Sequence, residues 1–165
     1  MTLTSSKWAI GLLILIVALF ILLLIGKKSV STEMTINAPR EKIWAVLTDI
    51  SQVANWNRVP IPVNGAMIEG STITYEFYQE EDGKVAVMDA QVSKLVPHWL
   101  INQKGGMSLI LTFDHKYLLE EINGKTTVKI NEQYNGIMVP FWNPAPVEKA
   151  YERLLLQLKN RIENE

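Results

Sequence analysis

The sequence TINAPREKIWAVLTDISQVANWN, which runs from Thr35 to Asn57, joins the end of a strand to a pair of helices. Apolar and polar side chains alternate over residues 30–37, and this period of two predicts a strand. Pro39 at the first helical position and Glu41 in the first turn predict that a helix begins there. The apolar face of this helix consists of Ile43, Trp44, Val46 and Leu47.

A second, short helix is expected directly after the first. Residues 49–52, Asp-Ile-Ser-Gln, have the pattern of a capping box, and the helix that they start carries Val53, Ala54 and Trp56. The stretch Val-Pro-Ile-Pro at 59–62 ends it, because a helix interior does not tolerate proline. The segment therefore predicts one strand followed by two helices.

The remainder of the chain alternates strands with turns and then ends in a long helix. Turn-forming residues separate a series of about six strands between residues 66 and 134; they are Glu-Asp-Gly-Lys at 81–84, Pro97, Gly105-Gly106 and Asn123-Gly124. Apolar residues then recur at helical spacing on one side of the last segment: Val147, Ala150, Tyr151, Leu154, Leu155, Leu158 and Ile162. Short turns imply antiparallel pairing, and the apolar stripe must be buried against the sheet. We expect an α+β fold in which a curved antiparallel sheet of about six to seven strands wraps around one long C-terminal helix.

The N-terminal segment is a predicted transmembrane anchor. Residues 8–26, WAIGLLILIVALFILLLIG, carry no charge, and a helix of this length spans roughly 28 Å, about the thickness of the hydrocarbon core of a bilayer. A cleaved signal peptide is the alternative, but its apolar core would be shorter and a small-x-small cleavage site should follow. We therefore expect residues 1–28 to form a single-pass anchor and residues 29–165 to form one domain. Lys27 and Lys28 favour, by a small margin, a cytoplasmic position for that domain.

Composition excludes several classes of function. Removing the apolar segment together with Lys7, Lys27 and Lys28 leaves 13 basic residues (16 minus 3) against 17 acidic ones, a formal charge of −4, which argues against a nucleic-acid surface. The absence of cysteine excludes disulfides, thiolate catalysis and cysteine zinc sites. His98 and His115 lack metal-ligand spacing, and no P-loop or other cofactor motif is present. The sequence thus predicts no nucleic-acid partner, no metal and no cofactor.

Three features resemble the polyketide cyclase/dehydrase-like branch of the SRPBCC superfamily. They are the stretch Thr35–Asn57, the Gly-Lys-Thr-Thr turn at 124–127 into a strand that ends at Glu132 with Gly136 after it, and the last helix, which finishes LLLQLKNRIENE. The resemblance covers residues 30–165. It implies the helix-grip fold that START lipid-transfer domains and the birch-pollen allergen share, with an internal cavity for lipids, quinones, hormones or polyketides. Only some members of the superfamily catalyse reactions, so the resemblance specifies the fold better than the function.

The Asn123-Gly124 turn sets the register of the last two strands. A two-residue type I′ turn pairs Leu119 with Val128, Tyr117 with Ile130, His115 with Glu132 and Phe113 with Tyr134 on the apolar face. His115 and Glu132 are the polar exceptions on this face, directly opposite each other. Three interpretations stay open: a ligand anchor, an acid–base pair, or a pair that only satisfies its own hydrogen bonds, as buried polar residues usually do.

A turn at Asp82-Gly83 predicts a second hairpin. A two-residue loop pairs Tyr75 with Ala90, Phe77 with Met88 and Ile73 with Val92 on the apolar face. It also places Glu76 opposite Asp89, an unfavourable pair of like charges, whereas a longer loop with an even number of residues keeps the same faces. Tyr75 is the candidate cavity hydroxyl of this hairpin.

Aromatic side chains in predicted loops complete the candidate site. Trp56 and the pair Phe141-Trp142 lie in segments that surround the cavity mouth in a helix-grip fold, where they either form a gate or membrane-touching rim, or plug the end of the cavity. The candidate ligand-binding residues are Trp56, Tyr75, Phe113, His115, Tyr117, Glu132, Tyr134, Phe141, Trp142 and Tyr151.

These features favour a membrane-anchored domain that binds a hydrophobic small molecule, such as a lipid, a quinone or a polyketide-like compound. The anchor is expected to bring the cavity mouth close to the bilayer, into which such ligands partition. One alternative is a cyclase- or dehydratase-type enzyme in which Glu132 and His115 act as acid and base while Tyr75 or Tyr134 orients a carbonyl. Another is an interaction module whose own side chains fill the cavity, similar to the chaperone-activator members of the superfamily.

Overall fold

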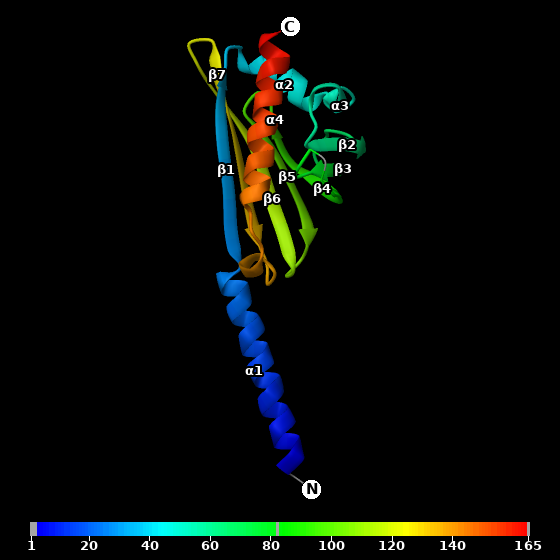
Figure 1. The fold of residues 1–165 in the computed structure, drawn as a ribbon, viewed down its shortest axis with the longest axis vertical. Helices are drawn as coiled ribbons and strands as arrows, with labels where there is room; N and C mark the ends of the chain where they lie inside the picture. The colour runs from blue at the N-terminus through cyan, green and yellow to red at the C-terminus, as the bar shows by residue number, and fades with distance from the viewer. Residues whose placement is uncertain (1–2, 82, 165) are drawn as a thin grey trace.

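In the computed structural model, which describes residues 3–81 and 83–164, a long N-terminal helix leads into an antiparallel sheet (Figure 1). The helices and strands are α1 (Leu3–Ile25), β1 (Lys27–Ile36), α2 (Arg40–Thr48), α3 (Val53–Trp56), β2 (Pro60–Asn64), β3 (Thr72–Tyr78), β4 (Val85–Val96), β5 (Leu100–Met107), β6 (Leu111–Ile122), β7 (Lys125–Asn135), the 3-10 helix η1 (Val139–Phe141) and α4 (Ala145–Glu163). Asp82, part of the turn predicted at 82–83, lies outside the described residues, as do residues 1, 2 and 165.

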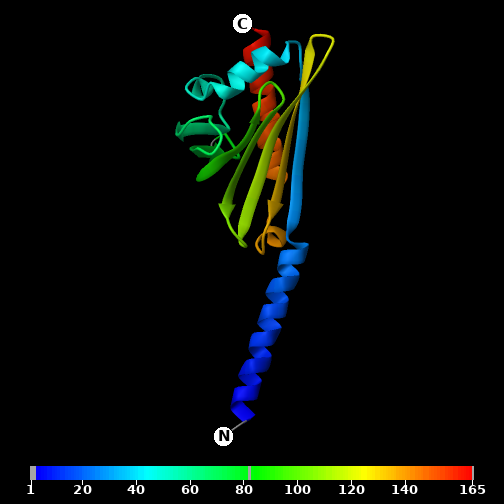
Figure 2. The same ribbon diagram turned by 180° about the vertical axis from the view of Figure 1, so that it is seen from behind.

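The seven strands of the described chain form one sheet in the order β1-β7-β6-β5-β4-β3-β2, with every neighbouring pair antiparallel. The sheet curves around α4, and α2 and α3 lie together at the end of the domain away from α1 (Figures 1 and 2). The predicted α+β class and helix-grip architecture are therefore confirmed, including the two short helices after the first strand.

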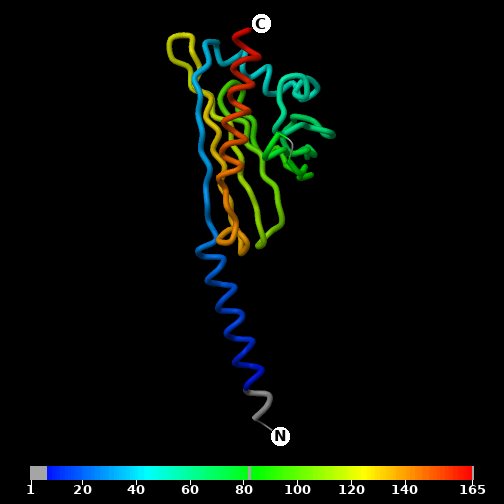
Figure 3. The backbone as a smooth tube through the Cα atoms, viewed as in Figure 1, coloured from blue at the N-terminus to red at the C-terminus, as the bar shows by residue number. Residues whose placement is uncertain are grey.

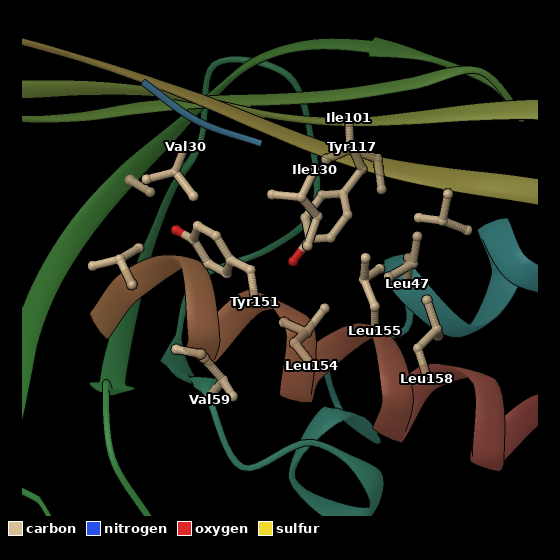
Figure 4. Packing of buried hydrophobic residues seen from close by; sticks show 14 of the residues in the cluster. Val30, Leu47, Val59, Ile101, Tyr117, Ile130, Tyr151, Leu154, Leu155 and Leu158 are labelled. Atoms are coloured by element: carbon tan, nitrogen blue, oxygen red, sulfur yellow. The ribbon is translucent and has the colours of Figure 1, made fainter. Parts of the chain in front are cut away.

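The predicted stripe of α4 forms much of the core. All seven of its residues are buried: Val147, Ala150, Tyr151, Leu154, Leu155, Leu158 and Ile162. Figure 4 shows the side chains of this helix facing those of the sheet, among them Ile130 and Tyr117. Burying one such leucine side chain stabilises a fold by about 1.5–3 kcal/mol, so α4 is a principal source of stability.

The predicted register of the β6–β7 hairpin is confirmed. Leu119 pairs with Val128, Tyr117 with Ile130, His115 with Glu132 and Phe113 with Tyr134. Asn123 and Gly124 have φ of 53° and 74°, as a type I′ turn requires at both central positions. The shortest connection between two strands thus allows their pairing to be counted from the sequence.

The β3–β4 hairpin differs from its predicted register by two residues. Tyr75 pairs with Met88, Phe77 with Ala86 and Ile73 with Ala90, because the connection spans residues 79–84. This even-numbered loop keeps the predicted faces. It also moves Asp89 away from Glu76 to a place opposite Thr74, whose hydroxyl donates a hydrogen bond of 2.7 Å to Asp89 Oδ1.

The predicted helix starts are wrong in detail. The capping box is not made, because the Ser51 hydroxyl donates to Asp49 Oδ1 at 2.6 Å, and α3 has no side-chain cap. Pro39 precedes α2 as its cap residue in extended conformation, so the helix begins one residue later than expected.

Three strand predictions are also corrected. β1 begins at Lys27, three residues early and inside the range assigned to the anchor. The proline-rich stretch after α3, expected only to end that helix, also forms strand β2, and its prolines are tolerated because β2 is at the edge of the sheet. Gly105 and Gly106 lie inside β5 instead of in a turn. A Cβ on Gly105 would collide with the ring of Phe113, its partner on β6, so glycine makes room for that ring.

Candidate ligand-binding site

A cavity lies between α4 and the inward face of strands β3 to β6. Its unfilled space, counted out to the open mouth, is about 660 Å³, and the centre of a water molecule can reach about 60 Å³ of it. Only the smaller of these volumes compares with ordinary pockets, and it is well below the about 300–1,000 Å³ that small-molecule pockets usually measure. Figure 4 shows Tyr117 from the sheet and Tyr151 from α4 lying between these two layers. Aromatic side chains thus occupy part of the interior, and a narrow open space remains.

Glu132 is the polar centre of this cavity. Its side chain is only 4% exposed, and its Oε2 accepts hydrogen bonds from the hydroxyls of Tyr134, at 2.7 Å, and Tyr151. The third neighbour, His115 Nδ1, lies 3.6 Å from the same oxygen. Among the described residues, no group donates a hydrogen bond to the other oxygen, Oε1, although Glu132 lines the cavity. The carboxylate therefore has one crowded oxygen and one without a protein donor.

His115 is held in place by aromatic rings. Its ring centroid lies 4.7 Å from that of Tyr117 and 5.1 Å from that of Tyr151. The strand pairing of β6 and β7 places it directly opposite Glu132, and Nδ1 faces the carboxylate. The ring also lines the cavity, so a ligand at Glu132 would lie against it.

The tyrosine hydroxyls of the site remain protonated at physiological pH. Burial raises the pKa of Tyr75 to about 12, although the bond of 2.8 Å from Gln103 Nε2 to its hydroxyl partly opposes this. Burial, followed by the charge of Glu132, raises the pKa of Tyr134 and of Tyr151 well above the ordinary value. Burial is also the main cause of the raised pKa of Tyr117. These groups therefore act as hydrogen-bond donors and not as anions.

The mouth of the cavity lies at α3 and β2. Its half-buried lining residues include Trp56, Pro60, Pro62 and Met67. Within residues 3–81 and 83–164, the indole Nε1 of Trp56 is the one buried side-chain nitrogen or oxygen that has no hydrogen-bond partner. Figures 1 and 2 show α3 and β2 in the part of the domain remote from α1. The half-buried lining at α3 and β2 thus lies away from α1, whereas the sequence-based expectation placed the mouth beside the anchor.

The structure brings most of the predicted candidate residues together. The cavity is lined by Trp56, Tyr75, Phe113, His115, Tyr117, Glu132 and Tyr151. Tyr134 is buried next to Glu132, and the half-buried Trp142 packs on it with a centroid distance of 4.5 Å. Phe141 is 72% exposed and outside the cavity lining, so it forms neither a gate nor a plug.

Sequence reasoning missed several lining residues. Asn57, Gln103, Met67 and Met88 also face the cavity. Gln103 lies on β5, for which no short turn gave a register, and the two methionines resemble ordinary core residues in the sequence. In the described part of the chain, no three His, Asp or Glu side chains gather in a way that could hold a metal ion.

Comparison with known proteins gives the family. Residues 37–162, which are 126 of the 165 positions, match the family described as activator of Hsp90 ATPase homolog 1-like protein. The chain belongs to this family. Its members share the SRPBCC-type fold that the sequence resembles, so the family is consistent with binding of small molecules. None of the curated proteins compared with the chain matches it.

Solved structures similar to this chain agree on the fold. Protein CV1439 from Chromobacterium violaceum has a TM-score of 0.68 at 16% identity, covering 82% of this chain and 96% of its own. CalU16 from Micromonospora echinospora has a TM-score of 0.61 at 16% identity, covering 83% and 75%. A protein from Arthrobacter aurescens has a TM-score of 0.65 at 14% identity, covering 83% and 87%. At this level of identity the likeness establishes the fold alone.

Proposed function

We propose that the domain binds a small, mostly apolar molecule in its cavity, that Glu132 holds a hydrogen-bond donor of that molecule, and that α1 attaches the domain to a membrane. The observation that carries the binding proposal is the uneven surrounding of Glu132. Oε1 has no donor from the described residues and is not among their fully buried unpaired atoms, so it is open to the cavity, whereas the protein donates hydrogen bonds to Oε2. An N–H or O–H of a ligand at Oε1 would supply the missing bond.

The shape of the cavity narrows the class of ligand. A space of which the centre of a water molecule reaches about 60 Å³ suits a single ring or a short branched chain better than a long acyl chain. The Trp56 side chain lines the mouth, but its indole Nε1 is closed to water and is therefore not offered to a ligand. The preferred ligand is therefore small and carries a hydrogen-bond donor at its inner end.

The geometry of Glu132 and the cavity also bears on the two alternative functions, an enzyme and an interaction module. In an enzyme, Glu132 would have to exchange a proton, but two tyrosine hydroxyls already donate to its Oε2 and occupy that oxygen. In an interaction module, the cavity would be filled and its polar groups would satisfy one another. The open cavity and the Glu132 oxygen that has no donor among the described residues favour ligand binding over both.

The attachment to a membrane is supported by α1 and its junction with the sheet. Residues Lys7–Ile25 have a mean hydropathy of 3.2, none of this window is buried, and its length and composition suffice to cross a bilayer. Gly26 immediately precedes β1, and its carbonyl accepts a hydrogen bond of 2.9 Å from the Gly136 amide. Cleavage of a signal peptide at this point would remove a backbone contact of the folded domain, so a retained anchor fits better.

Native mass spectrometry of the full chain, released from detergent, tests the binding proposal. We expect wild-type protein to carry a small molecule that Glu132→Leu loses and that Glu120→Gln, a matched change of an exposed carboxylate on β6, retains. Extraction and mass analysis would then identify it. The proposal is wrong if no molecule copurifies and no small amine, alcohol or phenol raises the Tm of the wild-type chain. Resistance of the full chain to extraction from membranes by carbonate tests the anchor separately.

A further inference from the structure

The end of the domain beside α1 carries an exposed apolar surface. Outside α1, twelve large hydrophobic side chains are exposed in the described chain, and five of them lie in two short segments at this end. We call these five residues the apolar tip: Met107, Leu109, Ile110, Met138 and Phe141, with exposed fractions from 41% to 72%. Clustered exposed apolar side chains usually mark a surface that contacts a partner or a membrane.

The apolar tip is continuous with the end of α1. The Ile137 and Met138 amides donate to the carbonyls of Leu109 and Ile110, at 2.9 and 3.1 Å, which joins the β5–β6 turn to the segment before η1. The amide of Gly136, the residue just before Ile137, donates a hydrogen bond to the carbonyl of Gly26. Figure 3 shows both segments next to the point where α1 meets the sheet. The exposed surface thus begins where the apolar helix ends.

The junction leaves little freedom between α1 and the apolar tip. One residue, Gly26, separates α1 from β1. A Cβ on Gly26 would overlap the Gly136 carbonyl, and a Cβ on Gly136 would overlap the Ile110 carbonyl. Three backbone segments therefore meet in direct contact, and the tip stays at the level at which α1 ends.

Two local features present the tip outward. Leu109 has φ of 66°, a left-handed conformation that bulky residues rarely adopt, and yet its side chain is 67% exposed. The Lys28 ammonium donates to the carbonyls of Pro140, at 3.3 Å, and Trp142. This ammonium braces the segment around η1 and leaves Phe141 on the outside.

We propose that the apolar tip inserts into the interfacial layer of the bilayer that α1 spans. This inference rests on the membrane part of the proposed function. The occupant is a phospholipid surface, because the tip adjoins the helix that would cross it and because the exposed Lys27 ammonium lies at the same level, where it suits lipid phosphates. Insertion fixes the orientation of the domain, so the cavity mouth at α3 and β2 opens away from the membrane.

Single-cysteine labelling of the full chain tests this, because the chain contains no native cysteine. Phe141→Cys and Leu109→Cys report on the apolar tip, and Val17→Cys reports on α1. Ile122→Cys is the matched control, since Ile122 is also apolar and 72% exposed but lies at the β6–β7 turn, at the other end of the sheet. Each variant is labelled with the environment-sensitive fluorophore NBD and reconstituted into phosphatidylcholine–phosphatidylglycerol vesicles containing nitroxide lipids. Thermal unfolding confirms that each labelled variant is folded.

We expect nitroxide lipids to quench labels at positions 17, 109 and 141 several-fold more than the label at 122. Quenching at 17, but at 109 and 141 only to the level at 122, would overturn the inference and leave the anchor standing. Absence of quenching at 17 would overturn the membrane part of the proposed function itself. Blue-shifted emission at 109 and 141 without quenching by lipid would mean that protein, such as a second copy of the chain, covers the tip, and this also overturns the inference.

Discussion

The two halves of the sheet bury the same kind of alternating face in different ways. On the β1–β7 half, the residues of α4 seal the face, and Ile130, Leu154 and Leu158 are almost fully buried. On the β3–β6 half, inward residues such as Tyr75, Phe113 and Tyr117 border a cavity instead. The difference arises from the position of α4, which is tied to the β1 side, for example by the bond of 2.8 Å from Lys159 Nζ to the Thr35 carbonyl.

The polar site lies on the boundary between these halves. Glu132 belongs to β7, and Tyr151 belongs to α4, yet both line the cavity. The sealed half thus holds the carboxylate rigidly, while the open half provides the space for a ligand. A single helix that covers only part of a sheet thus leaves room on that sheet for both a packed core and an open cavity.

The largest expected effect is a loss in the free energy of unfolding when a buried residue of the sealed half is truncated. Leu158→Ala should lower the free energy of unfolding by about 2–5 kcal/mol, because Leu158 is fully buried on α4. Leu156→Ala, on the same helix but 50% exposed, should change it by less than about 0.5 kcal/mol. Met67→Ala at the cavity mouth should fall between the two values. Urea unfolding measures all three, and equal losses for Leu158→Ala and Leu156→Ala would contradict the distinction between sealed and exposed positions.

The next effect is a loss of stability at alkaline pH, which the tyrosines around the cavity should cause. The pKa of Tyr75 is raised to about 12, and those of Tyr117, Tyr134 and Tyr151 are raised further. Unfolded tyrosine titrates near pH 10, so between pH 10 and 12 the unfolded chain loses these protons while the folded chain keeps them. The contribution of these tyrosines to the free energy of unfolding should therefore be fully present below pH 10. Above pH 10 the free energy of unfolding should fall by about 1.4 kcal/mol per pH unit for each such tyrosine.

Absorbance at 295 nm, recorded beside circular dichroism, checks this pH dependence. We expect these buried tyrosines to ionise only as the fold is lost, and Tyr75→Phe to make the alkaline decline shallower. Ionisation of all five tyrosines near pH 10 with the circular dichroism unchanged would show that the site is open to water.

The smallest expected effect is on the stability of chains shortened at the start of β1, the edge strand of the sealed half. A chain shortened to begin at Gly26 keeps all of β1, whereas one that begins at Ser29 loses Lys28 and its bond to the Pro140 carbonyl. Both should unfold cooperatively, and the shorter one should be less stable by about 1 kcal/mol. If neither shortened chain shows a cooperative thermal transition, the domain depends on α1 for its folding. Residues 29–165 would then not form a domain separate from the anchor.

The sequence was informative where local chemistry decides structure. The Asn123-Gly124 turn permits one compact geometry, so the partners of His115 and Phe113 could be counted directly. The 3.6-residue period of α4 likewise predicts which of its residues are buried.

The rest depended on tertiary structure. The two central residues of the β3–β4 loop did not give its length, and the longer loop places Asp89 opposite Thr74 instead of Glu76. Gly105 was taken for a turn residue, since the need for glycine there comes from the Asp89 carbonyl and the Phe113 ring on the two neighbouring strands. Whether an inward residue such as Met88 borders core or cavity depends on where α4 lies, and no local pattern contains that information.

Methyl NMR of methionine tests the central claim, that the open half binds a ligand through Glu132. Met67 and Met88 line the cavity, whereas Met34 on β1 packs against the sealed core. The full chain, labelled with ¹³C at its methionine methyl groups, is titrated with benzylamine and with toluene, which has a similar ring and no donor. We predict that both probes shift Met67 and Met88 but not Met34, that benzylamine binds at least about 10-fold more tightly, and that Glu132→Gln, but not Glu120→Gln, removes this advantage. Unmoved Met67 and Met88 signals, or the same preference in wild type and Glu132→Gln, would contradict the account.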